Sequence, residues 1–142
     1  MELNSLSLLF ERSRQLCGHQ EFVILGNLSI LGVVRAIDAS ERMLMSIDVD
    51  CYTKLDPDRI SGLTDSLGEG SMFEIEHGFY LDPISPKLPT LPDLWEARLI
   101  RVPLENGITL YFLDPNDVAV SKYARGEPRD REWLQAGLGA GL

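Results

Sequence analysis

Two aspartates one residue apart, Asp48 and Asp50, are the residues whose types and spacing most directly suggest chemistry. They lie in an apolar run, residues 43–52, that is bounded by charged and turn-forming residues and is typical of a β-strand. Strand side chains alternate between faces, so the two carboxylates share a face roughly 7 Å apart, while Val49 and Cys51 face the other way. Paired carboxylates repel each other unless a cation or solvent offsets them, and such hard oxygen ligands suit Mg²⁺. The alternative interpretation is a solvated strand end without a ligand.

Composition and charge limit the classes of protein to consider. We expect the 142 residues to form one domain, 1–142, because this length suffices for one buried core. Lys and Arg number 13 against 22 Asp and Glu, and the net charge of -9 disfavours nucleic-acid binding outside a local basic patch. Cys17 and Cys51 lie in apolar runs without metal-ligand spacing, which is typical of reduced thiols. With no apolar run of membrane-spanning length and no signal-peptide pattern, we expect a cytoplasmic protein without a membrane segment.

The first half of the sequence predicts the elements that must position the two aspartates. Helices are expected over residues 4–17, 28–37 and 57–67, where apolar residues recur at helical spacing. Residues 21–25 are a short continuous apolar run, which is typical of a central strand covered on both faces. This strand ends at Gly26-Asn27, and the predicted order is helix, strand, helix and then the Asp-x-Asp strand.

The second half predicts more strands and a pair of helices. Residues 72–76 and 79–84 have the composition of one interrupted strand or of two strands, and periodicity does not decide between them. A proline-rich surface loop follows, and then Asn106-Gly107 between two apolar runs predicts a β-hairpin. Asp114 begins a helix that ends at Arg125, and Pro128 begins the last helix. The elements predict an α/β or α+β fold, in which a mixed sheet is flanked by helices and ends in a C-terminal helical pair.

Three motifs in this order resemble those of the small bacterial nucleotidyltransferase-like proteins of the DNA polymerase beta superfamily. They are Gly26-Asn27, Ser46-Ile47-Asp48-Val49-Asp50, and Leu113 to Lys122 with Arg125 and Arg129-Asp130. The family pattern is a Gly-Gly or Gly-Ser at the end of a strand, a helix, an Asp-x-Asp strand, and later a helix with a lysine followed by a basic residue and an aspartate. The likeness is strongest to a group akin to abortive-infection toxins. It covers most of the chain from Phe22 to Trp133 and implies a minimal nucleotidyltransferase core.

This resemblance implies Mg²⁺-dependent transfer of a nucleotide from an NTP to an acceptor. It implies that Asp48 and Asp50 are metal ligands and catalytic carboxylates. The family generally has a third carboxylate on a neighbouring strand, for which Asp82 is the candidate, with Glu74 and Glu76 as substitutes. An aspartate that caps a turn before proline is an equally good interpretation of Asp82.

Nucleotide binding is also implied by the resemblance. Its residues would be Gly26, Asn27, Lys122, Arg125 and Arg129, of which the first two let the phosphates approach the backbone and the last three act as cations. A solvated helix face is the alternative interpretation of the three cations. We expect Asp130 to orient Lys122 or Arg125 through a hydrogen bond, and Trp133 to anchor the last helix to the core.

One departure from the family pattern leaves a second function open. Asn27 stands where the family usually has Gly, Ser or Thr, which crowds the approach of the phosphates. The first hypothesis is an active enzyme whose acceptor is RNA, protein or a small molecule, in a toxin-antitoxin or phage-defence pair. The second is a catalytically inactive nucleotidyltransferase-like protein that binds a partner protein, for instance as an antitoxin.

Overall fold

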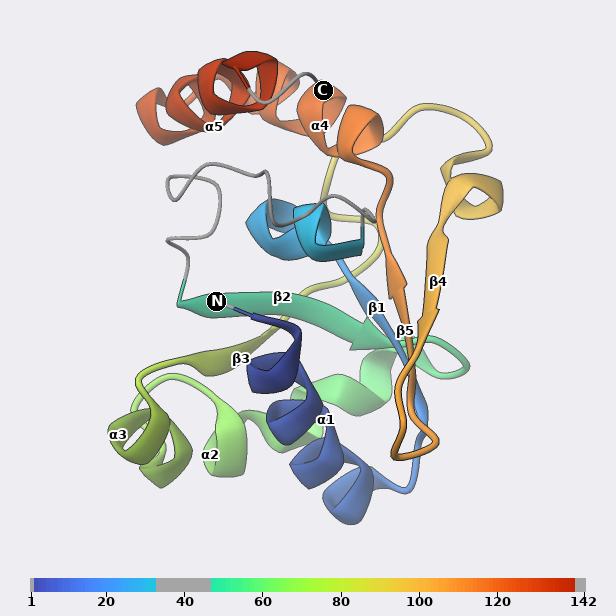
Figure 1. Cartoon of the computed structure of the whole chain (residues 1–142), viewed down its shortest axis with the longest axis vertical. Helices are drawn as coiled ribbons and strands as arrows, with labels where there is room; N and C mark the ends of the chain where they lie inside the picture. The colour runs from blue at the N-terminus through green and yellow to red at the C-terminus, as the bar shows by residue number, and fades with distance from the viewer. Residues whose placement is uncertain (1, 33–46, 140–142) are drawn as a thin grey trace.

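The fold is built on a five-stranded sheet with both parallel and antiparallel pairs, in a computed structural model that describes residues 2–32 and 47–139 (Figure 1). The strand order is β3-β2-β1-β5-β4. The parallel pairs are β1 with β5 and β2 with β3, and the antiparallel pairs are β1 with β2 and β4 with β5. The strands are β1 (Glu21–Ile24), β2 (Asp48–Thr53), β3 (Tyr80–Pro83), β4 (Ile100–Pro103) and β5 (Thr109–Phe112). The predicted mixed sheet flanked by helices is confirmed.

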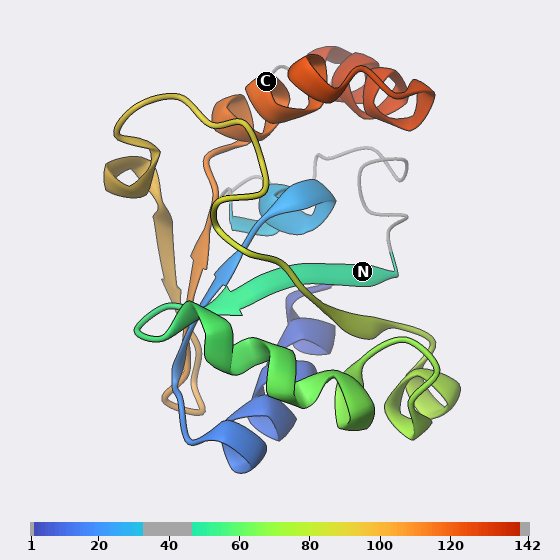
Figure 2. The same ribbon diagram turned by 180° about the vertical axis from the view of Figure 1, so that it is seen from behind.

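Helices cover both faces of this sheet. Figures 1 and 2 show α1, α2 and α3 on one side of the sheet and α4 and α5 on the other. The helices are α1 (Leu3–Cys17), α2 (Thr64–Leu67), α3 (Met72–His77), α4 (Pro115–Arg125) and α5 (Pro128–Gly139), with 3₁₀ helices η1 (Gly26–Gly32), η4 (Pro57–Leu63) and η5 (Trp95–Arg98). No helix among the described residues is long and apolar enough to cross a membrane.

The core lies where α1 packs on the central strand. β1 is covered on both faces, as predicted, since Phe22, Val23 and Ile24 are all fully buried. Helix α1 contributes the apolar stripe that includes Phe10, whose ring lies 4.6 Å from that of Phe22. Gly18 ends the helix in a left-handed conformation (φ 77°) that favours glycine. The rigid centre of the sheet therefore supports the strand that carries the two aspartates.

Strand β2 holds Asp48 and Asp50 at a defined place on the sheet. Val49 and Cys51 are fully buried on the face opposite the aspartates, which sets the direction of both carboxylates. The backbone N–H of Leu25, at the end of β1, donates to the carbonyl of Asp50 at 2.8 Å. The turn that follows β1 is thereby held next to Asp50.

The strand expected at residues 72–76 is wrong, because these residues form helix α3. The Ser71 side chain caps this helix by accepting a hydrogen bond from the Glu74 backbone N–H. The Glu74 carboxylate in turn accepts one from the Gly70 backbone N–H. Ser and Glu three positions apart are a helix-start signature, so a local cap overrode the apolar composition that suggested a strand. Gly78, at φ 81°, ends the helix before β3.

The helix expected over residues 28–37 is described only in part. Its described portion, η1, begins at Gly26 itself and is a 3₁₀ helix. Gly32 lies against the Phe112 ring, where a Cβ would overlap it, so this segment runs unusually close to β5. Residues 33–46, which include Ser46 of the Asp-x-Asp motif, lie outside the described residues.

The predicted hairpin and the two C-terminal helices are confirmed. Strands β4 and β5 are joined through Asn106-Gly107, with Gly107 at φ 86°. The Asp114 side chain caps α4 by accepting a hydrogen bond from the Asn116 backbone N–H at 2.8 Å. Gly126 ends α4 in a left-handed conformation, and α5 begins two residues later at Pro128. This tight connection packs α4, which carries Lys122 and Arg125, against α5, which carries Arg129.

Candidate active site

Three carboxylates from two neighbouring strands form an acidic cluster. Asp48 and Asp50 come from β2, and Asp82 comes from β3, where the parallel register pairs it directly with Asp50. Each residue offers an oxygen, and these three oxygens all lie within 4.8 Å of one another. We call these residues the acidic triad. Glu74 and Glu76, the substitutes considered for the third carboxylate, lie on α3 and are not members of it.

The acidic triad concentrates negative charge in a partly buried place. Burial, and then the charges of Asp48 and Asp82, raise the pKa of Asp50 from 3.8 to about 8. Carboxylates this close together do not all ionise unless a cation offsets their charge. A divalent cation would do so, and it prefers hard oxygen ligands of this kind. The residues present therefore fit a hard metal ion such as Mg²⁺.

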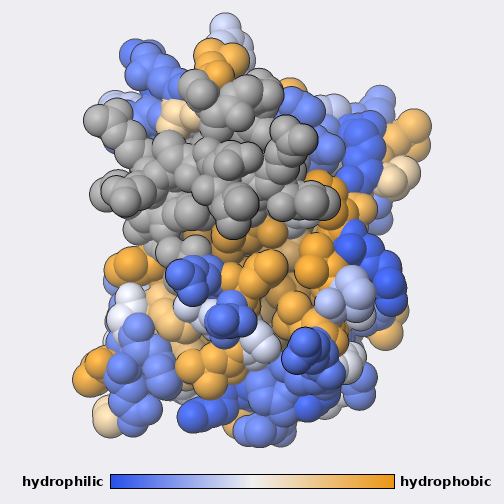
Figure 3. Space-filling view, in the orientation of Figure 1, coloured by the Kyte–Doolittle hydropathy of each residue, from blue (hydrophilic) through white to orange (hydrophobic). Residues whose placement is uncertain are grey.

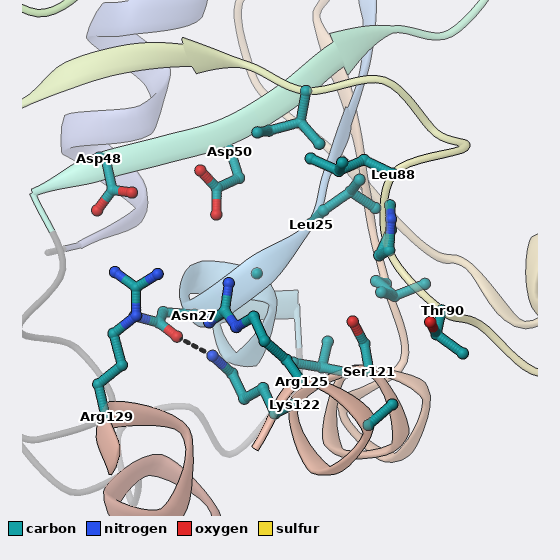
Figure 4. A pocket seen from close by; sticks show the side chains of 16 residues that line it. Leu25, Asn27, Asp48, Asp50, Leu88, Thr90, Ser121, Lys122, Arg125 and Arg129 are labelled. Atoms are coloured by element: carbon teal, nitrogen blue, oxygen red, sulfur yellow. Dashed lines mark hydrogen bonds between the residues drawn. The ribbon is translucent and has the colours of Figure 1, made fainter. Parts of the chain in front are cut away.

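Side chains of opposite charge line the same cavity of about 460 Å³ as Asp48 and Asp50 of the acidic triad. Figure 4 shows Lys122, Arg125 and Arg129 projecting from the C-terminal helices toward the side of the cavity that holds Asp48 and Asp50. Lys122 and Arg125 belong to α4, and Arg129 belongs to α5. We call these three residues the cationic wall.

Lys122 is the innermost cation, with only 6 % of its side chain exposed. Its ammonium donates a hydrogen bond to the side-chain oxygen of Asn27 and lies 3.6 Å from a carboxylate oxygen of Asp130. It also lies 5.1 Å from the centre of the Trp133 ring. Burial is the main cause that lowers the pKa of Lys122, while Asp130 opposes this shift. Lys122 therefore ties the turn after β1 to the C-terminal helices.

Asp130 organises the other end of the cationic wall. It is fully buried and accepts hydrogen bonds from the Arg125 guanidinium, at 2.7 Å from Nε and also from Nη2. The backbone N–H of Glu127 donates a further hydrogen bond at 3.2 Å. The hydrogen bonds from Arg125 are the main cause that lowers the pKa of Asp130, so the carboxylate stays charged. Arg129, by contrast, is 69 % exposed and bonds only to Glu127 among the described residues.

Gly26 makes the close approach between the β1 turn and the acidic triad possible. Its φ of 67° is in the left-handed region that favours glycine. A Cβ at this position would overlap the carboxylate of Asp50. Any larger residue would therefore displace either the turn or the metal-ligand candidate.

The sequence matches a known protein family over almost its whole length. Residues 4–139 match the family described as "Nucleotidyltransferase of unknown function (DUF6036)". The chain belongs to this nucleotidyltransferase family. Neither the curated proteins nor the solved structures include a significant match to it. The expected likeness to nucleotidyltransferases is confirmed, and family membership implies a nucleotide as substrate, whereas the likeness to abortive-infection toxins stays a prediction.

Sequence reasoning missed two features, one that supports the candidate site from outside and one that lines its cavity. Asp117, in the first turn of α4, is only 4 % exposed, and both its oxygens accept hydrogen bonds from Arg98, each at 2.9 Å. No sequence signal pairs residues of η5 and α4. The second feature is the part of the cavity lined by Leu88 and Thr90, and the proline-rich stretch around them was the only signal for it.

Proposed function

We propose that this chain is an Mg²⁺-dependent enzyme that transfers a nucleotide from an NTP to an acceptor. The observation that carries the proposal is the placement of Asp48 and Asp50, two members of the acidic triad, and of the cationic wall around one cavity. An NTP with a bound divalent metal binds to groups of both charges, because carboxylates coordinate the metal and cations contact the phosphates.

Each part of the site has a role in this proposal. Asp48, Asp50 and Asp82 hold the metal, which when bound neutralises charge on the phosphates. Arg125 and Arg129 contact the triphosphate, and the bare backbone at Gly26 gives it room. In the reaction the oxygen of an acceptor hydroxyl loses its proton to solvent and forms a bond to the α-phosphorus, the bond from the α-phosphorus to the bridging oxygen breaks, and pyrophosphate leaves.

The hydrogen bond between Asn27 and Lys122 favours a second candidate function. It ties up the ammonium that would otherwise face the phosphates and fills the turn with a side chain. A chain with this contact could bind a partner protein without catalysis, as an antitoxin would. The two candidates differ in whether the site binds Mg²⁺ and NTP together.

Isothermal titration with Mg²⁺ and each NTP, followed by measurement of pyrophosphate release, separates the two candidates. The enzyme proposal expects Mg²⁺-dependent NTP binding, and Asp48→Asn and Asp82→Asn should reduce turnover by about 100-fold or more. Asp65→Asn, at an exposed position on α2, is the matched control and should leave NTP binding and turnover unchanged. Absence of NTP binding with Mg²⁺ and with Mn²⁺ would overturn the enzyme proposal.

The cationic wall is best tested at its exposed member. Arg129→Ala should weaken NTP binding by about 1–2 kcal/mol with little loss of fold stability, because the arginine is mostly exposed. Lys122→Ala should weaken binding too, but the buried ammonium also contributes to the fold. Arg12→Ala, at an exposed position on α1, is the control for loss of one positive charge.

The biological setting that we propose is a toxin-antitoxin or phage-defence pair, which rests on the resemblance of the motifs alone. Expression of the chain in a bacterial host tests this setting. A toxin should arrest growth, and Asp48→Asn should abolish the arrest. Equal growth with the parent chain and with Asp48→Asn would remove this part of the proposal.

A further inference from the structure

The cavity of the candidate active site changes in chemistry from one end to the other. Figure 4 shows Asp48 and Arg129 at one end, and Leu25, Leu88, Thr90 and Ser121 at the opposite end. The first end has two charged side chains, while the second has aliphatic groups and two hydroxyls. A ligand that fills the cavity therefore needs a charged part and a largely apolar part.

Three separate elements build the apolar end. Leu25 follows β1 and is buried, Ser121 is on α4, and residues 88–90 belong to the loop after β3. Leu113 and Val118, which flank the start of α4, also line the cavity and are buried. Leu88, in contrast, is 72 % exposed. A large apolar side chain that is mostly exposed beside a cavity can contact a ligand that enters there.

We propose that this apolar end binds the nucleobase of the NTP, and that the loop carrying Leu88 and Thr90 is the nucleobase contact. The inference rests on the proposed function, which places the triphosphate between the acidic triad and the cationic wall. A nucleotide joins a polyanion to a flat, weakly polar ring, so its two halves match the two ends of the cavity. A volume of about 460 Å³ lies within the usual range for small-molecule sites.

The polar groups at the apolar end limit how strongly the site can choose between bases. Thr90 and Ser121 carry the only side-chain polar atoms among the labelled residues there, and a hydroxyl can both donate and accept a hydrogen bond. A hydroxyl can therefore pair with a donor or with an acceptor on the edge of any base. Strong discrimination between bases needs groups that only donate or only accept. The four NTPs should therefore bind within about tenfold of one another.

A comparison of ligands with and without a base tests this inference. The probes are the α,β-methylene analogue of ATP, which cannot react, and ribose 5-triphosphate, which has the same sugar and phosphates but no base. Both are titrated with Mg²⁺ into the parent chain and into Leu88→Ala and Leu88→Gln. Leu55→Ala is the matched control, since Leu55 is 74 % exposed and does not line the cavity.

The parent chain should bind the ATP analogue about tenfold or more tightly than ribose 5-triphosphate, because only the former buries a base. Leu88→Ala and Leu88→Gln should each weaken the ATP analogue about five- to tenfold and leave ribose 5-triphosphate unchanged. Equal affinities of the parent for the two probes, or equal losses for both probes in the Leu88 variants, would overturn the inference. Unchanged affinity of both Leu88 variants for the ATP analogue would also overturn it. Failure of both probes to bind the parent would instead overturn the proposed function.

Discussion

Asp50 has a pKa of about 8 because burial removes water from its carboxylate and two like charges lie beside it. A fold tolerates such a group when a ligand or a proton neutralises it. In Asp50 the same carboxylate is held by β2, lies against Gly26 and belongs to the acidic triad. A carboxylate that destabilises the metal-free fold and has a strongly shifted pKa is typical of a functional site.

The stability of the metal-free protein should fall as the pH rises. In the unfolded chain Asp50 ionises near its ordinary pKa of 3.8, whereas in the fold it keeps its proton until about pH 8. The folded state thus binds more protons between these values, so its stability is greatest below the unfolded pKa and is lost as the pH rises through the folded pKa. Asp50→Asn stays neutral and should raise the free energy of unfolding at high pH by about 1–3 kcal/mol. Urea unfolding in EDTA at several pH values measures this.

The matched control for this prediction is Asp65→Asn, at an exposed position outside the acidic triad. It should leave the pH profile of the parent unchanged. Identical profiles for the parent and Asp50→Asn would show that Asp50 ionises normally in the fold, and the argument from crowded charge would be lost.

At the scale of elements, the paired hydrogen bonds between Arg98 and Asp117 fix the start of α4. Helix α4 carries two members of the cationic wall, so its position decides where the phosphates would meet positive charge. Arg98 also donates to the backbone carbonyl of Asp93 at 3.1 Å, which extends this link to the loop before η5. The site therefore depends on an ion pair that does not touch it.

Replacing Arg98 alone should destabilise the protein more than expected from the variant in which both partners are replaced. Arg98→Ala leaves the buried Asp117 carboxylate without its bidentate partner, so it should destabilise the protein more than Arg101→Ala, the control at an exposed position on β4. The double variant Arg98→Ala with Asp117→Asn should be less destabilised than the sum of the single changes. Chemical denaturation of all four variants measures the coupling. Additive losses would mean that the pair contributes nothing beyond its separate side chains.

Trp133 should be the anchor of α5, the other helix that contributes to the cationic wall. It is only 4 % exposed and lies beside the Lys122 ammonium. Trp133→Ala should lower the free energy of unfolding by about 3–5 kcal/mol and reduce helix content measured by circular dichroism. Leu138→Ala, at an exposed position on the same helix, should change stability by less than about 0.5 kcal/mol. Comparable losses in the two variants would rule out Trp133 as the anchor.

At the scale of the whole molecule, the net charge of -9 opposes binding of a polyanionic substrate. Binding of an NTP therefore needs a local group of positive charges. Figure 3 shows hydrophobic side chains gathered across the middle of one face, with hydrophilic side chains over much of the surface below them. The cationic wall is a local exception to the overall charge, and it lines a cavity with Lys122 buried and Arg129 mostly exposed to solvent and salt.

The NTP affinity should therefore depend on salt, and the dependence should come from the cationic wall. We expect a loss of about tenfold between roughly 0.05 M and 0.5 M NaCl, because salt screens the attraction of the phosphates to the guanidinium groups. Arg129→Ala should reduce this salt dependence, while Arg12→Ala should keep that of the parent. Salt-independent binding in titrations of the parent would show that the cationic wall does not hold the triphosphate.

The sequence by itself determined features that depend on neighbouring residues. Period-two alternation placed Asp48 and Asp50 on one face of a strand whatever the fold around it. Asn106-Gly107 determined the hairpin, and Asp114 the start of α4, because turns and caps are made by side chains and backbone a few residues apart. A local signal of the same kind at Ser71 and Glu74 determines helix α3, although the apolar composition of residues 72–76 is typical of a strand.

Only the tertiary structure decided which distant residues meet. Asp82 joins Asp50 through the register of two parallel strands, which no periodicity in the sequence specifies. Asn27 and Lys122 are 95 positions apart and meet only because α4 packs on η1. The pairing of Arg98 with Asp117 has the same origin. Such contacts depend on which faces of the helices and strands pack together, and that choice is made by the summed burial of the whole core rather than by any short segment of the chain.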